Sequence, residues 1–430
     1  MIDLLLRNAR LQDGSGLIDL AVDKGVFIDR GVNLDYPARG EVDLQGRLLV
    51  PGFVEPHAHL DIALMNSWVQ PGRQEAFRFM SDLNEAIERR RKAFTQQDIE
   101  RRAGAALELA SRHGVTHLRA QCHLDTEIGL KHLEALLRVK ERYAGCVTVQ
   151  IVAFPQQGFW RNPGTLDLYR EAFRMGADVM GCASNLDFDD AGEVGFRHHI
   201  DTAFELAMEF DVDLDAHADL GIPQSVSLEE LEIVHIAHKT IETGYQGRVT
   251  AGHVCGLSSA TPDVAKQAIE LIREAGISVI SQPDLYRLGR EDTHNVRRGL
   301  TRVKELLAAG VNVTYASNNV RDALRPMGNF DPLEEALIVS YGAHMDTIDE
   351  FNTLLKMGTY HGAQALGLRD YGLEPGCHAD MVVLDAASPS AAIVGQVEKN
   401  HVFKAGRLMA SSWVHSQLYN GSQLEEIQKS

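Results

Sequence analysis

The chain starts with short apolar runs that are separated by glycine and aspartate turns. The runs "LLLRNARL", "LAVDKGVFID" and "EVDLQGRLLV" come first, and "ADMVVLDA" at 379–386 and "HVFKAGRLMAS" at 401–411 resemble them near the other end. Short apolar runs between turn residues are typical of β-strands. We therefore expect residues 1–52 and 375–430 to form one small β-sandwich domain together.

The middle of the chain alternates compact apolar runs with longer helical patterns. Helical stretches such as "LKHLEALLRVKERY" and "DVAKQAIELIREAG" place apolar residues three and four positions apart. The predicted strands begin with "LLVPGFVEPHAH" and continue at 114–121, 147–154, 179–186, 212–219, 248–254, 277–283 and 311–317. Eight strands that each precede a helix predict an α/β fold, a TIM-like (β/α)8 barrel over residues 53–374, whose active site lies at the C-terminal strand ends. A doubly wound open sheet is the alternative, but no G-x-G-x-x-G motif follows the first strand.

The composition fits a large globular domain with an acidic surface. The chain has 430 residues, of which 44% are hydrophobic, and its 60 acidic and 42 basic residues give a net charge of -18. Nucleic acids and anionic membranes require a basic face, so neither is expected as a partner. A small neutral or cationic molecule fits the charge better, although an ordinary solvated surface explains it equally well.

The lack of a recognisable targeting signal and the scattered cysteines both predict an intracellular protein. The first apolar run is interrupted by Arg7 and Arg10 and lacks the cleavage site of a signal peptide. No segment offers the ~18 uninterrupted apolar residues that cross a bilayer. The five cysteines are scattered and form no C-x-x-C pair. We expect the chain to reside in the reducing cytoplasm. The sequence leaves the oligomeric state open, and a homo-oligomer is one of the states that it allows.

Four histidines lie at predicted C-terminal strand ends. His57 and His59 end the first barrel strand as "HAH", His217 lies near the end of the fifth, and His253 closes the sixth. Residues two apart on a strand point to the same side, so His57 and His59 can reach one ion. A single such histidine is more often a hydrogen-bonded structural residue. Four of them at one end of a barrel favour a site for a metal that prefers imidazole, such as zinc, iron or nickel.

Longer motifs carry a resemblance to a known family. The motifs "VPGFVEPHAHLD", "QIVAFPQQG", "DAHAD", "TAGHVCGLSS" and "RDALRPMGNFDPLEEAL" occur in the order and at the spacing of the cytosine deaminase branch of the amidohydrolase superfamily. The chain resembles that branch over nearly its whole length. Members hold one divalent metal, usually iron or zinc, with an H-x-H pair, a fifth-strand histidine and an eighth-strand aspartate. The resemblance implies His57, His59 and His217 as ligands, with Asn318 at the aspartate position.

The resemblance also implies roles around the metal. His253 matches a histidine that orients the attacking water, and Gln156 matches a glutamine that hydrogen-bonds an amide edge of the heterocyclic substrate. Asn319 and Asp322 lie in "SNNVRD" on a loop that is expected to rim the pocket, and we predict that both contact the substrate. The expected chemistry is attack by activated water on a ring carbon, followed by protonation and loss of an amine.

Two acidic residues of that branch are missing. Asn318 replaces the metal-binding aspartate, and Leu220 stands where a glutamate that shuttles protons is expected. Asp219 is our first candidate to replace the glutamate, because it lies two residues after His217 and points to the same side of an extended strand.

Other residues near the strand ends are weaker candidates. Asp284, Asp322 and His123 are further candidates for proton transfer, although each could equally serve as a cap, a turn residue or a structural hydrogen-bonding group. Cys122 and Cys255 could be soft ligands, but small buried hydrophobes are the simpler interpretation. The pocket is expected to be shaped by loop aromatics and a methionine, namely Phe159, Trp160, Tyr286 and Met327.

We interpret the chain as a metal-dependent hydrolase that acts on a C–N bond of a small polar N-heterocycle or cyclic amide. The retained histidines and Gln156 favour a working site. Because two acidic positions are lost, a metal-assisted non-hydrolytic enzyme and an inactive ligand-binding relative remain alternatives.

Overall fold

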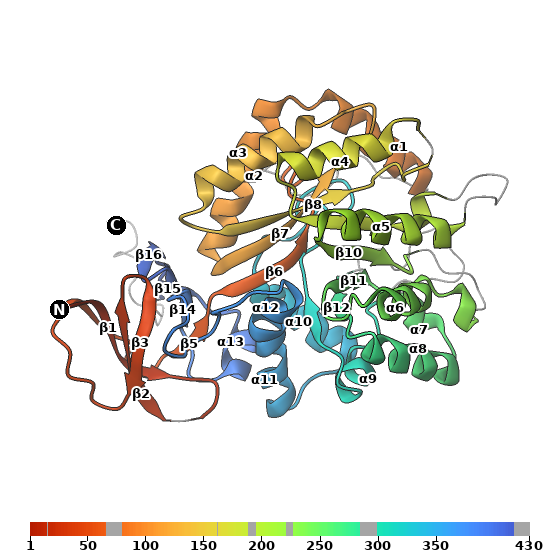
Figure 1. The fold of residues 1–430 in the computed structure, drawn as a ribbon. Helices are drawn as coiled ribbons and strands as arrows, with labels where there is room; N and C mark the ends of the chain where they lie inside the picture. Colours follow the sequence, from red (N-terminus) through yellow and green to blue (C-terminus); the bar gives the residue numbers. More distant parts are fainter. Residues whose placement is uncertain are drawn as a thin grey trace, which may run out of the picture.

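The protein combines a closed barrel of parallel strands with a separate β layer (Figure 1). The computed structural model describes residues 1–14, 16–65, 80–160, 162–187, 195–220, 227–283 and 299–416. Helices surround the barrel, and the β layer lies to one side of it, where the red strands of the N-terminal part lie beside the blue strands of the C-terminal part (Figure 1). The predicted α/β class and TIM-like barrel are confirmed.

The barrel strands follow one another in chain order, and each is parallel to the next. They are β6 (Phe53–Ala58), β7 (Val115–His123), β8 (Thr148–Phe154), β9 (Val179–Ala183), β10 (Asp213–Ala218), β11 (Val249–His253), β12 (Ser278–Ser281) and β13 (Val313–Tyr315). The ring closes just after β13, where the Asn318 amide N donates to the His57 carbonyl at 3.0 Å and the His59 amide N donates to the Asn318 carbonyl at 2.8 Å. These two bonds fix His57, His59 and Asn318, three residues with predicted roles in the site, against one another.

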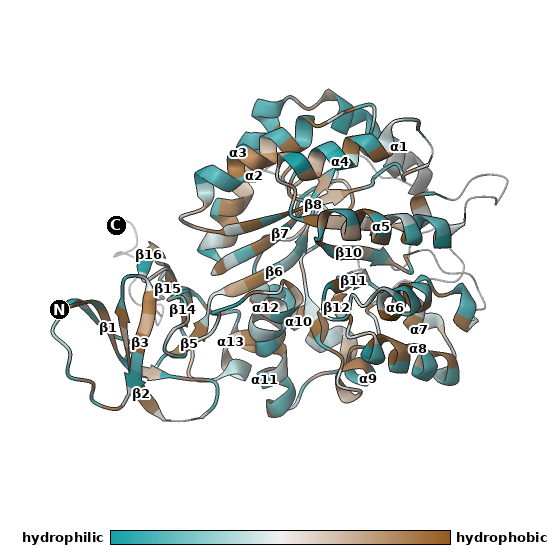
Figure 2. Cartoon of the chain, in the orientation of Figure 1, coloured by the Kyte–Doolittle hydropathy of each residue, from teal (hydrophilic) through white to brown (hydrophobic). Residues whose placement is uncertain are grey.

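The helices cover the barrel with their apolar faces. In α8 (Pro262–Glu274), the buried residues Ala265, Ala268, Ile269 and Ile272 recur at helical spacing. Figure 2 shows polar colours toward the solvent side of the surrounding helices. None of the described helices is long and apolar enough to cross a bilayer. The helices are α1 (Met80–Ala93), α2 (Gln96–Arg112), α3 (Lys131–Tyr143), α4 (Thr165–Met175), α5 (Phe196–Phe210), α6 (Glu232–Thr243), α7 (Gly256–Ser259), α8 (Pro262–Glu274), α9 (Val303–Ala308), α10 (Pro332–Ala343), α11 (Ile348–Lys356), α12 (Gly362–Ala365) and α13 (Pro389–Gly395).

Both ends of the chain contribute to the separate β layer, as the sequence predicts. Its N-terminal strand β5 pairs antiparallel with the C-terminal strand β14, so the two parts form one sheet around a common apolar core. The domain boundaries after residues 52 and 374 stay a prediction. The strands of the layer are β1 (Ile2–Arg10), β2 (Leu17–Asp23), β3 (Val26–Gly31), β4 (Ala38–Asp43), β5 (Leu48–Pro51), β14 (Met381–Leu384), β15 (Lys399–Lys404) and β16 (Arg407–Ala410).

A buried polar cluster joins the β layer to the barrel. Lys404 Nζ, at the end of β15, donates to Asp380 Oδ2 at 2.6 Å and to the Thr116 carbonyl of β7 at 3.1 Å. The same ammonium lies 3.4 Å from His117 Nε2. Burial first, and then the nearby Lys404 ammonium, lowers the pKa of His117 to about 3. The junction therefore requires a neutral imidazole.

This junction predicts a loss of stability in mild acid. In the unfolded chain His117 titrates near 6.5, whereas in the folded chain its pKa is about 3. Between these values the unfolded state binds the extra proton, so the free energy of unfolding falls as the pH drops below about 6.5, by at most ~1.4 kcal/mol per pH unit. We expect His117→Gln to flatten the decline between pH 7 and pH 5 in urea unfolding.

The control for this measurement is His238→Gln, which changes an exposed histidine of α6. Parallel pH curves for His117→Gln and the unchanged protein would contradict the assignment.

Candidate metal centre and active site

Three imidazoles meet at the C-terminal end of the barrel. His57 lies in β6, His59 follows the same strand, and His217 lies in β10 on the other side of the ring. All three are buried, with exposed fractions of 0%, 6% and 4%. His217 Nε2 is 3.1 Å from His57 Nε2 and 3.2 Å from His59 Nε2. The structure thus brings the three predicted imidazole ligands together through the same ring nitrogen.

The spacing of these nitrogens fits a shared metal ion. Nitrogens bound at about 2.0–2.1 Å to a tetrahedral ion lie about 3.3 Å apart, close to the separations around His217. Burial first, and then the neighbouring histidines, lowers the pKa values of His59 and His217 well below the ordinary range. Their rings are therefore neutral and carry lone pairs, as metal ligands must. The residues present fit a divalent metal with nitrogen ligands.

A buried carboxylate orients one of these rings. Asp215 lies two residues before His217 on β10, and its Oδ1 accepts from His57 Nδ1 at 3.1 Å. The carboxylate also accepts from Gln121 Nε2 at 3.0 Å and from the Thr250 hydroxyl at 2.9 Å. Burial alone raises the pKa of Asp215, but His57 and further polar partners outweigh burial and hold it below the ordinary value. With Nδ1 of His57 donating to a carboxylate, Nε2 is left as the ligand atom, as is usual at metal sites.

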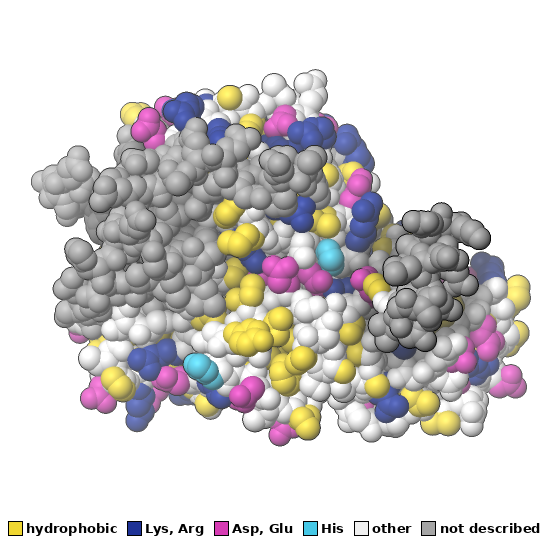
Figure 3. Space-filling view, turned by 180° about the vertical axis from the view of Figure 1, so that it is seen from behind, with side chains coloured by type: hydrophobic (Ala, Val, Ile, Leu, Met, Phe, Trp, Pro, Cys, Tyr) yellow, Lys and Arg dark blue, Asp and Glu magenta, His cyan; other side chains and the backbone are white. Residues whose placement is uncertain are grey.

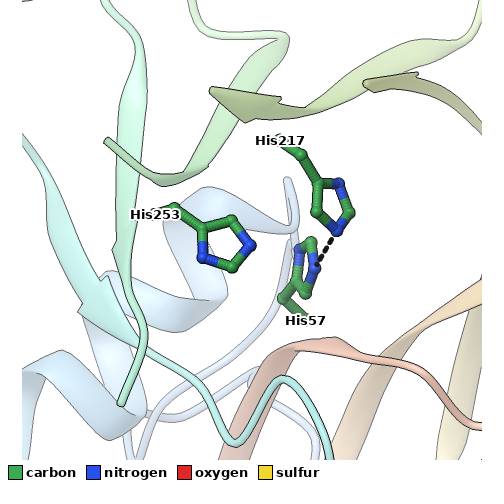
Figure 4. Close-up of side chains that lie close together, drawn as sticks. All are labelled: His57, His217 and His253. Carbon is green, nitrogen blue, oxygen red and sulfur yellow. Dashed lines mark hydrogen bonds between the residues drawn. The ribbon is translucent and has the colours of Figure 1, made fainter. Parts of the chain in front are cut away.

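His253 belongs to the same cluster. It ends β11, and its ring centroid lies 5.2 Å from that of His217 and 6.2 Å from that of His57. Figure 4 shows the His253 ring beside the other two, with the hydrogen-bond contact between His57 and His217 drawn as a dashed line. Ligand nitrogens of these three residues lie within 4.8 Å of one another. His253 is therefore close enough to contact whatever the imidazoles bind.

Asn318 is the residue that the sequence predicts as the fourth ligand. It follows β13, is 2% exposed, and its two backbone bonds to His57 and His59 place it against the first strand. Its side-chain Oδ1 is buried and has no hydrogen-bond partner within the described part of the chain. An amide oxygen without a partner is available as a neutral ligand. Asn318 has φ +59 and His253 φ +68, a region that residues other than glycine adopt mainly where function or packing demands it.

Asp219 points toward a helix rather than toward the imidazoles. Its Oδ1 accepts from the Glu232 amide N at 2.7 Å, at the first residue of α6, and its own amide N donates to Glu232 Oε2 at 2.5 Å. Burial first, and then the Glu232 carboxylate, raises the pKa of Asp219 well above the ordinary value. These contacts favour the capping role that the sequence left open. Leu220 is half-buried beside it and contributes no proton-transfer group.

The predicted substrate-binding residues divide into two places. Gln156 is half-buried after β8, and its side chain has no hydrogen bond to any described residue. Asn319 and Asp322 lie together after β13, where Asn319 Nδ2 donates to Asp322 Oδ2 at 2.6 Å. Asp322 Oδ1 accepts from the amides of Leu324 and Arg325 and so holds the turn that supports Asn319. Asn319 keeps a buried Oδ1 that has no partner among the described residues.

Sequence reasoning named His123 as a candidate but missed Asp61 and His132, the other members of a second buried cluster. Asp61 Oδ2 accepts from His123 Nδ1 at 2.7 Å and from His132 Nδ1, on α3, at 2.6 Å. These separations are shorter than the spacing of two ligands on one ion, so they are hydrogen bonds. The His123 ring stacks on that of His59, with centroids 5.3 Å apart. Asp61 therefore fixes a ring that supports a predicted ligand.

Aromatic and sulfur side chains complete the surroundings. Phe154, at the end of β8, packs against His59 and His217, with ring centroids 5.3 and 4.5 Å away. Phe159 is buried against His199, whereas Trp160 is 42% exposed and stacks on His198. Cys122 and Cys255 are buried, and burial raises the pKa of the Cys122 thiol well above the ordinary value. Met327 is exposed, and the remaining candidates, Asp284 and Tyr286, lie outside the described residues.

The chain matches the model of the amidohydrolase family over residues 40–159 and 74–410. It is 31% identical over 425 residues to the N-isopropylammelide isopropyl amidohydrolase of Pseudomonas sp. (strain ADP), an alignment that covers 96% of this chain and 98% of that protein.

Two solved structures share the whole architecture. The 5-methylcytosine deaminase of Klebsiella pneumoniae, liganded with 5-fluorocytosine, superposes with a TM-score of 0.86 at 29% identity and covers 96% of this chain and 99% of its own. The N-isopropylammelide isopropylaminohydrolase of Burkholderia multivorans gives a TM-score of 0.83 at 28% identity and the same coverage.

Proposed function

The chain belongs to the amidohydrolase family, and on that premise we propose that it is a metal-dependent hydrolase that cleaves a C–N bond of a small polar N-heterocycle. The observation that carries the proposal is the approach of His57 Nε2 and of His59 Nε2 to His217 Nε2, at 3.1 and 3.2 Å. Buried imidazoles held at this spacing fit one divalent ion, for which zinc and iron are the first choices.

The chain's own residues then divide the work. His57, His59, His217 and the Asn318 amide oxygen would hold the ion, and a bound ion would lower the pKa of water so that it can attack a ring carbon. Asp215 keeps the His57 ring turned with Nε2 inward. His253, beside His217, is placed to hold the proton of the attacking water and pass it to the leaving nitrogen.

The family relatives support the substrate class. One relative is named as an isopropyl amidohydrolase of N-isopropylammelide, and another as a deaminase of 5-methylcytosine. We propose that this chain acts on the same kind of planar ring and releases ammonia or an alkylamine. The half-buried Gln156 and the unpaired Asn319 Oδ1 offer polar contacts to such a ring.

A small-molecule substrate in a reducing cytoplasm also fits the surface and the cysteines. On the face shown in Figure 3, basic and acidic side chains are interspersed, and the net charge of -18 disfavours polyanions. The five scattered cysteines support the proposed cytoplasmic location.

A metal analysis combined with an amine-release screen tests this proposal. We expect about one zinc or iron ion per purified chain, and release of ammonia or alkylamine from at least one member of a panel of aminated and N-alkylated pyrimidines and triazines. Removal of the ion with a chelator should abolish release, and return of the ion should restore it.

The outcomes separate the alternatives. A chain that binds metal but releases no amine from any panel member would favour a non-hydrolytic reaction. A chain that retains no transition metal after purification in zinc-containing buffer would leave only a ligand-binding role.

A further inference from the structure

Gln282 is a buried amide that has no hydrogen-bond partner among the residues that the structure describes. It follows the last residue of β12, at the barrel end where active sites of this fold lie. The side chain is 2% exposed, and both Oε1 and Nε2 are buried without a hydrogen bond to any described residue. Buried amides in folded proteins are nearly always paired, because an unpaired donor or acceptor is costly. A missing partner for Gln282 must therefore offer both an acceptor and a donor.

The Gln282 amide lies beside the predicted metal ligands. A Cβ placed on Gly252 of β11 would lie 2.8 Å from Gln282 Nε2 and 3.5 Å from both Nδ1 and Cε1 of His57. The absence of a side chain at Gly252 thus leaves room for Gln282 next to the His57 ring. Gly252 is also the register partner of His217 on the neighbouring strand. The free amide is therefore inside the barrel at the level of the imidazoles.

A further amide oxygen without a partner lies at the neighbouring strand end. β12 pairs with β13, with Ser281 opposite Tyr315, and after β13 Asn319 carries a buried Oδ1 that has no hydrogen-bond partner among the described residues. A polar ligand that enters here therefore meets the unsatisfied amides of Gln282 and Asn319. A set of unsatisfied groups that converge beside a metal site is typical of a pocket that is completed by its ligand.

We propose that Gln282 binds the lactam edge of the substrate, with Nε2 donating to a ring carbonyl and Oε1 accepting from the adjacent ring N–H. A primary amide offers this donor and acceptor side by side, in the pattern complementary to a cyclic –CO–NH– group. The inference rests on the proposed function and narrows its substrate class to heterocycles that keep a lactam or ureide edge besides the C–N bond that is cleaved. Gln282 follows β12, whereas Gln156 follows β8, so the two amides come from different strand ends.

The test compares Gln282→Met with the unchanged protein. Uracil and cyanuric acid, which both carry lactam edges, serve as probes in calorimetric titrations of the metal-loaded protein. We expect Gln282→Met to raise the Kd of both probes by about 10- to 100-fold. 1,3-Dimethyluracil, which has no ring N–H, should bind the two proteins with more similar Kd values.

The melting temperature of Gln282→Met provides a second readout. If Gln282 had a structural role, the substitution would lower the Tm. Because the amide has no partner among the described residues, its replacement by methionine should leave the Tm of the ligand-free protein unchanged or raise it. The matched control is Gln121→Met, another fully buried glutamine, whose Nε2 donates to Asp215. That change should lower the Tm.

Several results would overturn the inference. These are an unchanged Kd for Gln282→Met, a lowered Tm without a change in Kd, and an unchanged protein that binds neither uracil nor cyanuric acid. Probe binding that depends on Gln282 in a chain that releases no amine would leave the inference intact and remove the proposed hydrolysis.

Discussion

Replacement of His217 by alanine is expected to prevent stable metal binding and to lower kcat/KM by at least about a thousandfold. His217 is the residue whose Nε2 approaches both His57 Nε2 and His59 Nε2. Its loss therefore removes the imidazole that lies beside both of the other predicted ligands. A bound metal contributes several kcal/mol to such reactions, and each ~1.4 kcal/mol corresponds to a factor of ten.

Metal content by mass spectrometry and steady-state kinetics on a substrate found in the screen measure this effect. His238→Ala is the matched control, because it removes an exposed imidazole from α6. It should retain metal and activity. A His217→Ala protein that binds a full equivalent of metal with unchanged affinity would falsify the assignment of His217 as a ligand.

Asp215→Asn is expected to reduce both stability and metal affinity. The change leaves Arg119, which is fully buried with its Nη1 3.4 Å from Asp215 Oδ2, without its anionic partner. Loss of one member of a buried ion pair costs about 3–5 kcal/mol. The change also removes the carboxylate that accepts from His57 Nδ1, and loss of such a partner typically weakens metal binding about 10- to 100-fold.

Urea unfolding and competition with a metal chelator give the two quantities. Asp213→Asn is the control on the same strand, because Asp213 pairs with Arg248 where both side chains are about one-third exposed. Exposed pairs contribute about 1 kcal/mol or less. Equal losses of stability for Asp215→Asn and Asp213→Asn would show that the buried carboxylate has no special role.

The barrel was predictable because its strands and helices alternate in apolar pattern along the chain. The predicted strand at 114–121 became β7, Val115–His123, and that at 147–154 became β8, Thr148–Phe154. The closure of the ring was less evident. It depends on backbone bonds between Asn318 and the His57–His59 segment, which no sequence pattern displays.

The imidazoles of the site were predictable because each lies at a strand end, where the fold collects functional groups. Asp215 was missed although the signal was present, since it lies two residues before His217 and shares its side of β10. His132 gave no such signal, because it lies on α3 and reaches Asp61 only through the packing of that helix on the barrel. Asp219 shows the opposite case, in which a residue next to a ligand turns away to cap a helix.

Gln282 shows why some of the site has no signature in sequence. Its buried amide has no hydrogen-bond partner among the described residues. This absence is visible only when all neighbouring side chains are in place. Asn318 is a similar case. The sequence marked this residue only as a departure from the family pattern. That its Oδ1 has no hydrogen-bond partner among the described residues is visible only in the structure.

The pairing of β5 with β14 has a consequence for how the protein is made. The ribosome releases β5 at residues 48–51 long before β14 at 381–384, and all of the barrel is synthesised between them. During that time the edge of β5 that later receives β14 has no native partner and offers its backbone groups to other chains. Newly made protein therefore carries an unpaired strand edge until β14 emerges, and unpaired edges of this kind favour aggregation.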